Sequence, residues 1–215
     1  PLAFNALAPL SREVGAPEVL DLTAERSLLV SGSNVLALHV LNQTVASTDL
    51  SIIPSLKSQV EIVGAELSLN RIVSSTAVAR SSAWSYWKGS AEPSAVLGDW
   101  TALGFADASW AVGTAGFGYG DNDDATLLTD MPNGYSTVYI RRRFTVTDRA
   151  SISGMTLGVD FDDGFIAYLN GVEVARAFAP GAAGQFQPRT ALATASHEAG
   201  AEQTFDLASR LGQLL

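Results

Sequence analysis

Short β-rich runs, each ended by a cluster of Gly, Pro, Asn, Asp or Ser, make up most of this 215-residue chain. Residues 34–42 (NVLALHVLN) place apolar side chains on both faces of an extended strand, which is typical of a central strand covered on both sides. Residues 137–146 (TVYIRRRFTV) alternate more clearly, with Val138 and Ile140 on one face and Tyr139 and Arg141 on the other. The pattern predicts an all-β sandwich or barrel rather than alternating βαβ units.

Two turn signals divide residues 155–176. Asp162-Asp163-Gly164 predicts a tight turn after a strand at 155–161. Asn170-Gly171 favours a type I′ hairpin turn, because both central residues of that turn need a positive φ. We therefore expect a three-strand meander. Helix is expected to be scarce: 107–110 and 207–215 are each sufficient for only a turn or two.

Composition excludes several classes of function. The chain has no Cys, so disulfides, thiolate zinc sites, iron–sulfur clusters and cysteine nucleophiles are ruled out. Its two histidines, His39 and His197, cannot form a three-histidine zinc centre and make a serine–histidine triad a weak hypothesis. A net charge of −9 with only two lysines disfavours nucleic acid as a partner. The chain contains no run of about 18 consecutive apolar residues, so membrane insertion is not expected.

Residues 6–30 and 191–215 resemble one another at a constant offset of 185 residues. Ten of the 25 aligned positions are identical, including a Ser, a Glu, a Gly and an Asp, where chance predicts roughly two or three. We predict that residues 1–70 are the C-terminal strands of a preceding repeat and that 71–215 form the next sandwich, truncated at its C-terminus. On this hypothesis residues 30–64 complete the sandwich in cis. Shared low complexity is the alternative explanation.

A set of motifs then suggests a family. Their order is SxWxYW (82–87), GDW (98–100), FADASW (105–110), GxAGFGYGDNDD (113–124), YIRRRF (139–144), DFDDGFIAYLNGVEVAR (160–176) and, from the first part of the chain, NVLALHVLN. The set resembles the galactose-binding-like jelly-roll modules found in tandem in large bacterial surface proteins. Its DDGxxxYxNG core is similar to the sugar-binding domain of family 2 glycoside hydrolases. The resemblance implies a jelly-roll β-sandwich with little helix.

The same resemblance implies a function without catalysis. We expect a module of a larger secreted or cell-surface protein that binds carbohydrate or another surface ligand, or that spaces neighbouring domains of the same polypeptide. A chain that begins at Pro1 is expected to be a piece of such a protein. The alternative is an accessory domain of a glycoside hydrolase whose catalytic domain lies elsewhere. Because this fold hosts many functions, the residues themselves have to decide between these hypotheses.

The densest acidic cluster contains Asp121, Asn122, Asp123 and Asp124. Carboxylate and amide oxygens at this spacing suit Ca²⁺, which accepts flexible oxygen coordination. The segment lacks the glycine and the glutamate that an EF-hand loop places at its sixth and twelfth positions. A calcium site and a solvated acidic loop are therefore the two hypotheses for these residues, and no other cofactor is expected.

A second acidic group contains Asp160, Asp162 and Asp163. Strand alternation places Asp160 and Asp162 on one face, and turn chemistry accounts for Asp163. A pair of glycosidase carboxylates is a weak alternative, because nothing else in the chain suggests a catalytic cleft. Arg142 falls on the apolar face of its strand and needs a partner, which we expect to be this acidic group.

Aromatic side chains offer a sugar-stacking surface or, alternatively, anchors for the core of a sandwich. For Trp100 and Trp110 the sequence context favours the structural role. Trp84 and Trp87 are less clearly structural and remain candidates for ligand contact. The predicted ligand-binding residues are Trp84, Trp87, Tyr119 and Asp121.

Overall fold

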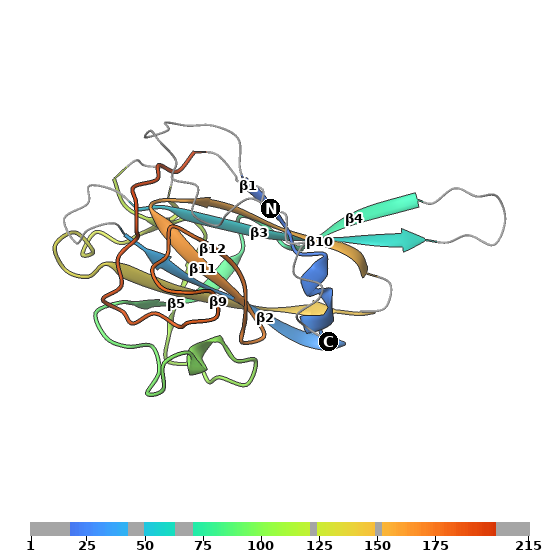
Figure 1. The fold of residues 1–215 in the computed structure, drawn as a ribbon, viewed down its shortest axis with the longest axis horizontal. Coiled ribbons are helices and arrows are strands. Elements are labelled where there is room, and N and C mark those ends of the chain that lie inside the picture. The colour runs from blue at the N-terminus through green and yellow to red at the C-terminus, as the bar shows by residue number, and fades with distance from the viewer. Residues whose placement is uncertain (1–17, 43–49, 63–70, 121–123, 149–151, 201–215) are drawn as a thin grey trace.

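A computed structural model describes residues 18–42, 50–62, 71–120, 124–148 and 152–200. Within these residues the chain forms two antiparallel sheets and a short parallel pair (Figure 1). The four-stranded sheet has the order β1 (Glu18–Asp21), β10 (Ile152–Phe161), β3 (Ile52–Ile62) and β4 (Arg71–Val78). The six-stranded sheet has the order β12 (Val172–Ala177), β11 (Gly164–Leu169), β2 (Gly32–Leu41), β9 (Thr137–Val146), β5 (Ala83–Lys88) and β6 (Ala111–Thr114). The prediction of an all-β fold is confirmed.

The remaining elements are short. Strands β7 (Phe117–Gly118) and β8 (Thr126–Leu127) form the parallel pair. Two 3₁₀ helices, η1 (Ala24–Leu28) and η2 (Asp99–Thr101), lie in connections between strands. The segment 107–110 forms a single turn closed by the Trp110 amide, which donates to the Asp107 carbonyl at 3.0 Å. Helix is therefore scarce, as predicted, and the segment 207–215 lies outside the described residues.

The main core lies between the two sheets, and β2 supplies Leu36, Leu38 and Val40 to it. The opposite face of β2 supplies Ala37 and Leu41 to a second apolar cluster, on the outer face of the six-stranded sheet. The prediction that residues 34–42 form a central strand covered on both sides is confirmed. Burial of both faces explains why this run is apolar at nearly every position.

Strand β9 shows the predicted alternation. Val138 and Ile140 belong to the core between the sheets, and Tyr139 belongs to the outer cluster. The predicted partner of Arg142 is wrong, however. Its guanidinium donates to the carbonyl oxygen of Ala83, the first residue of the neighbouring strand β5. The acidic group is not the partner because it follows β10, which lies in the other sheet from β9.

The predicted meander over 155–176 is half correct. Strands β11 and β12 form the expected hairpin, with Asn170 and Gly171 at φ values of 52° and 91°. Strand β10, in contrast, pairs with β1 and β3 in the four-stranded sheet. The Asp162–Asp163 segment therefore carries the chain from one sheet to the other. Turn residues reveal where a strand ends, but they do not reveal whether the next strand pairs with it.

Strands from the two predicted divisions of the chain, 1–70 and 71–215, are mixed in both sheets: they alternate in the four-stranded sheet, and β2 lies among strands of the second division in the six-stranded sheet. Strand β2 pairs with β9 on one side and with β11 on the other. Strand β3 lies between β10 and β4. Every one of the ten identical pairs in the repeat has at least one member outside the described residues. The assignment of residues 1–70 to a preceding repeat stays a prediction.

Candidate functional site

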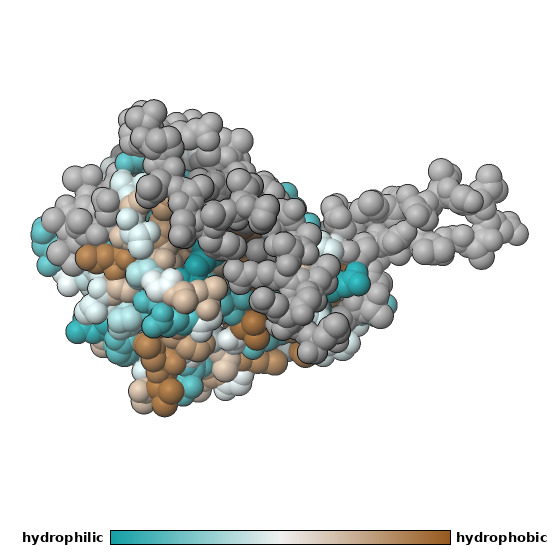
Figure 2. All heavy atoms as spheres, viewed as in Figure 1, coloured by the Kyte–Doolittle hydropathy of each residue, from teal (hydrophilic) through white to brown (hydrophobic). Residues whose placement is uncertain are grey.

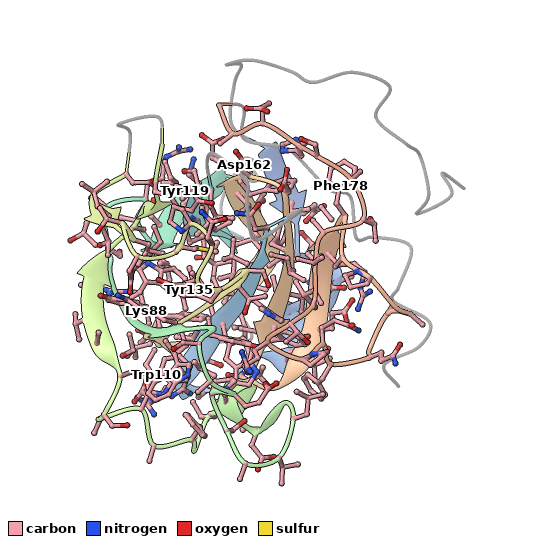
Figure 3. All side chains as sticks on the ribbon, turned by 90° about the vertical axis from the view of Figure 1, so that its left-hand side faces the viewer. Lys88, Trp110, Tyr119, Tyr135, Asp162 and Phe178 are labelled. Carbon is pink, nitrogen blue, oxygen red and sulfur yellow. The ribbon has the colours of Figure 1, made fainter. Side chains whose placement is uncertain are left out.

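The motif-rich loops meet at one end of the sandwich, where β2 and β10 end and β3 and β11 begin. We call Asn42, Ser51, Tyr119, Asp124 and Asp162 the loop-end cluster. Asn42 Nδ2 donates to the Tyr119 hydroxyl at 2.8 Å, and both residues are buried. The backbone of Tyr119 also forms a two-way bridge with Leu50, at 2.9 and 3.1 Å. The Asp162 amide donates to the Ser51 carbonyl oxygen at 2.8 Å, and Figure 3 shows the labelled Tyr119 and Asp162 at the same end of the molecule.

Glycines make room for Asp124 in this cluster. Its Oδ1 accepts a hydrogen bond from the Ser51 hydroxyl at 3.2 Å. A Cβ atom at Gly116 would lie 2.7 Å from the same oxygen, and one at Gly118 would collide with the Leu50 carbonyl oxygen and approach the Asp124 carboxylate. The glycines of the GFG stretch therefore allow a carboxylate to lie directly against the backbone.

The predicted calcium ligands are only partly described. Asp121, Asn122 and Asp123 lie outside the described residues. The prediction that Asp121 binds a ligand therefore stays a prediction. Asp124 is described, and its Oδ1 accepts a hydrogen bond from the Ser51 hydroxyl. In the described ranges, no three His, Asp or Glu side chains come together in a group that could hold a metal ion. Calcium binding stays a prediction.

The second acidic group holds the segment that follows β12 against the end of β10. Asp160 Oδ1 accepts the Gly200 amide at 2.7 Å, and its Oδ2 lies 3.3 Å from Arg80 Nη2. Asp163 accepts the His197 amide at 3.1 Å. The His197 ring stacks on Phe161 with centroids 4.1 Å apart, and burial is the main cause that lowers its pKa. These carboxylates bind the chain to itself.

The four tryptophans divide by burial. Trp84 is 1% exposed and lies in the core between the sheets, where its ring presents no open face, and its ligand contact stays a prediction. Alternation on β5 turns its indole inward. Trp100 and Trp110 are buried in the outer cluster, in agreement with their predicted structural role. Tyr119 is also buried, with its hydroxyl bonded to Asn42, and offers no stacking face.

Trp87 is the half-buried member of the set. Its ring centroid lies 6.0 Å from that of Trp110, and Phe105, also half-buried, lies 5.8 Å from Trp110. The Trp87 Nε1 donates to the Ala91 carbonyl at 3.0 Å. The three rings form a partly exposed aromatic group, which we call the Trp87 group. It lies on the outer face of the six-stranded sheet. Of the predicted ligand-binding residues that the structure describes, Trp87 is the one that is partly exposed.

An arginine anchor beside the Trp87 group was missed at the level of sequence. Arg141 has a side chain with 0% exposure, and its Nη1 lies 2.8 Å from Asp107 Oδ2. Its guanidinium also donates to the carbonyl oxygens of Phe105 and Ala102, at 3.0 and 2.8 Å. Arg143 completes the group, with its Nη1 2.8 Å from Asp107 Oδ1. Tyr139 and Arg141 are two residues apart on one strand and therefore share a face. The aromatic Tyr139 on that face was the sequence feature that could have indicated a buried Arg141.

Electrostatics at this anchor favour the ion pair. Burial by itself raises the pKa of Asp107, but the hydrogen bond from Arg143 and the charges of Arg141 and Arg143 outweigh that effect and hold the pKa below its usual range. Asp107 is therefore ionised at neutral pH. Its role is to fasten the loop that follows η2 onto the sheet.

A cavity lies at the opposite end of β9 from the loop-end cluster. It is lined by residues that include Leu29, Ser58, Phe144, Asp148 and Met155. Its walls contain none of the predicted ligand-binding residues.

Across the face seen in Figure 2, hydrophilic and hydrophobic residues are interspersed over the described surface. Among the described residues no helix has the length and apolar character needed to cross a membrane.

Comparison of the chain with protein-family models, with curated proteins and with solved structures gives no match.

Proposed function

We propose that this chain is a non-catalytic jelly-roll β-sandwich that serves as a spacer between neighbouring domains of a larger secreted or cell-surface protein. The observation that supports the proposal is that the described candidate tryptophans and carboxylates mostly make structural contacts within the chain. Trp84, Trp100 and Trp110 fill the two apolar clusters. Asp160 and Asp163 hold a backbone segment in place.

A spacer needs loops that hold their shape, and the contacts of this chain serve that need. The buried Arg141 ties the segment 102–107 to β9 through two carbonyl oxygens and a carboxylate. Charge-assisted bonds of this kind are shorter and stronger than neutral ones. Arg141 would be a poor catalytic group, because its side chain is completely buried and both of its Nη atoms already bond to the chain.

Carbohydrate binding at the Trp87 group is the second candidate, and one observation favours it. Trp87 and Phe105 are only half-buried and lie beside the buried Trp110. Arg143 pairs with Asp107 and donates to the Phe105 carbonyl oxygen at 2.7 Å, so charged groups lie at the backbone of this aromatic group. An indole face with polar neighbours is a suitable surface for the C–H face of a sugar ring. This candidate also covers an accessory domain of a glycoside hydrolase.

A glycan array separates the two candidates. The labelled 215-residue chain is applied in calcium-containing buffer and in buffer with a chelator, together with a Trp87→Ala variant. The spacer proposal expects signals at background in both buffers. Binding that the Trp87→Ala variant loses would overturn it in favour of carbohydrate recognition at the Trp87 group. Binding that only the chelator removes would overturn it in favour of a calcium-dependent site around Asp124.

A further inference from the structure

One edge of the four-stranded sheet is built by a short segment early in the chain, residues 18–29, which we call the first edge segment. It contains β1, which pairs antiparallel with β10, and η1. Leu20 and Leu22 are 0% exposed and Leu29 is 1% exposed, and all three belong to the core between the sheets. Asp21 Oδ1 accepts the Thr23 amide at 2.8 Å, a bond typical of an Asx turn, where the strand ends.

The same residue types recur 185 positions later. Residues 203–214 (QTFDLASRLGQL), the second edge segment, align without a gap with residues 18–29 (EVLDLTAERSLL) and lie outside the described residues. The positions of the three buried leucines hold Phe205, Leu207 and Leu214. Asp206 repeats the aspartate of the turn. Arg210 aligns with the buried Glu25, so the first edge segment is the better fit, in agreement with its place in the structure.

The described part of the chain leads the second edge segment to the same edge. The Gly200 amide donates to Asp160 Oδ1 at 2.7 Å, at the end of β10. Glu18, the first residue of β1, lies opposite Val159, which precedes Asp160. With the offset of 185, Gln203 takes the place of Glu18, and the three residues from Gly200 to Gln203 span about 10 Å when extended. From there the chain runs along β10 in the antiparallel direction of β1.

We propose that the second edge segment is an alternative occupant of the β10 edge and exchanges there with the first edge segment of the same chain. The sequence match, the point of entry and the strand direction all lead to this one occupant. The register follows from the core, because a shift of one residue would turn Phe205 and Leu207 away from it. The edge then has two donor segments, one from each end of the chain, and only one of them pairs with β10 at a time.

The absence of cysteine from the chain makes a direct test possible. Asp21 lies opposite Thr156 in the structure, so the proposal places Asp206 opposite Thr156 after exchange. Opposite residues of antiparallel strands lie within disulfide range, whereas a displacement of three residues exceeds it. Under mild oxidation, the reporter pair Thr156→Cys with Asp206→Cys is therefore expected to form an intramolecular disulfide about tenfold faster than the control pair Thr156→Cys with Gln203→Cys.

Two substitutions are expected to shift the exchange in opposite directions. Leu20→Asp places a charge at a buried position of β1 and is expected to raise the rate of the reporter disulfide about tenfold. Phe205→Asp is expected to lower that rate to the rate of the Gln203→Cys control. Leu192→Asp is the matched control, because its side chain is 41% exposed and lies outside both edge segments, and we expect no change.

A stability measurement covers the case in which Leu20→Asp prevents folding. Leu20→Ala is expected to lower the midpoint of thermal unfolding about twice as much in a chain that carries Phe205→Asp as in the unmodified chain, because the second edge segment then no longer replaces the first. Phe205→Asp alone is expected to leave the midpoint unchanged, since the first edge segment remains in place.

Three outcomes would contradict the proposal. The first is a reporter pair that forms its disulfide no faster than the control pair, with and without Leu20→Asp. The second is a reporter disulfide found only between copies on a non-reducing gel, because the occupant would then belong to another chain. The third is an additive effect of Leu20→Ala and Phe205→Asp on the midpoint. The proposal does not depend on the spacer function, since glycan binding has no bearing on which segment pairs with β10.

Discussion

His39 shows what burial does to a single polar residue in this molecule. Its ring lies in the outer cluster, stacked on Tyr139 with centroids 4.2 Å apart. Among the described residues its Nε2 has no hydrogen-bond partner. Burial lowers the pKa of the imidazole to about 3, so the folded chain holds His39 neutral at every physiological pH.

This residue predicts an acid-sensitive stability. Below about pH 6.5 an unfolded chain protonates His39, whereas the folded chain does not until about pH 3. The free energy of unfolding therefore falls as the pH drops through this window, by about 2 kcal/mol between pH 7 and pH 5. In His39→Phe that contribution is expected to disappear, leaving the smaller effect of His197, whose pKa is lowered by burial in the same direction. Urea unfolding at the two pH values measures the difference, and an equal loss in both proteins would contradict the assignment.

Asp107 predicts a second residue-scale effect, in which two neighbouring arginines behave differently. Asp107→Ala leaves the completely buried Arg141 guanidinium without its carboxylate, and we expect a cost of about 3 kcal/mol or more. Arg143→Ala is the matched control, because that side chain is 44% exposed and its pair with the same carboxylate contributes about 1 kcal/mol or less. Equal losses in urea unfolding would show that Arg141 does not depend on Asp107.

At the scale of elements, the β11–β12 turn joins local turn chemistry to tertiary contacts. The Asn170 side chain donates to the Leu28 carbonyl at 2.6 Å and to Asn34 Oδ1 at 2.9 Å, and it accepts the Val35 amide at 2.9 Å. The NG pair predicted the hairpin, but nothing local indicates that this asparagine also connects η1 and β2.

Two substitutions in the turn separate these roles. Gly171→Ala keeps the asparagine contacts and strains a residue at a φ of 91°, so we expect a loss of about 1 kcal/mol. Asn170→Gly keeps the turn geometry and removes three hydrogen bonds, for which we expect about 2–4 kcal/mol. Midpoints of urea unfolding rank the two variants, and a greater loss for Gly171→Ala would show that the turn matters more than its connections.

At the scale of the whole molecule, the two sheets interleave distant parts of the chain. Strand β2 lies between β9 and β11, and β3 lies between β10 and β4. Without residues before 71, the six-stranded sheet would lose a central strand and the main core would lose Leu36, Leu38 and Val40. Strand pairs this far apart in sequence form only when the entire chain is present.

A fragment of residues 71–215 is therefore expected to lack a cooperative thermal transition and native near-UV circular dichroism, whereas the full chain shows both. The physical reason is the loss of apolar burial on both faces of β2. A fragment that unfolds cooperatively by itself would mean that residues 71–215 form an independent domain.

Local patterns predicted where strands lie and which side chains share a face, because alternation and turn chemistry are local properties of the backbone. Residues 34–42 and 137–146 were identified as strands with the correct inward-facing residues. The choice of neighbouring strands came from long-range contacts: β10 and β11 lie in different sheets, Arg142 bonds to Ala83, and Trp84, Tyr119 and Arg141 are buried. These outcomes depend on contacts between residues far apart in the chain, since a face that is apolar in sequence can be covered by a sheet, by a loop or by another copy.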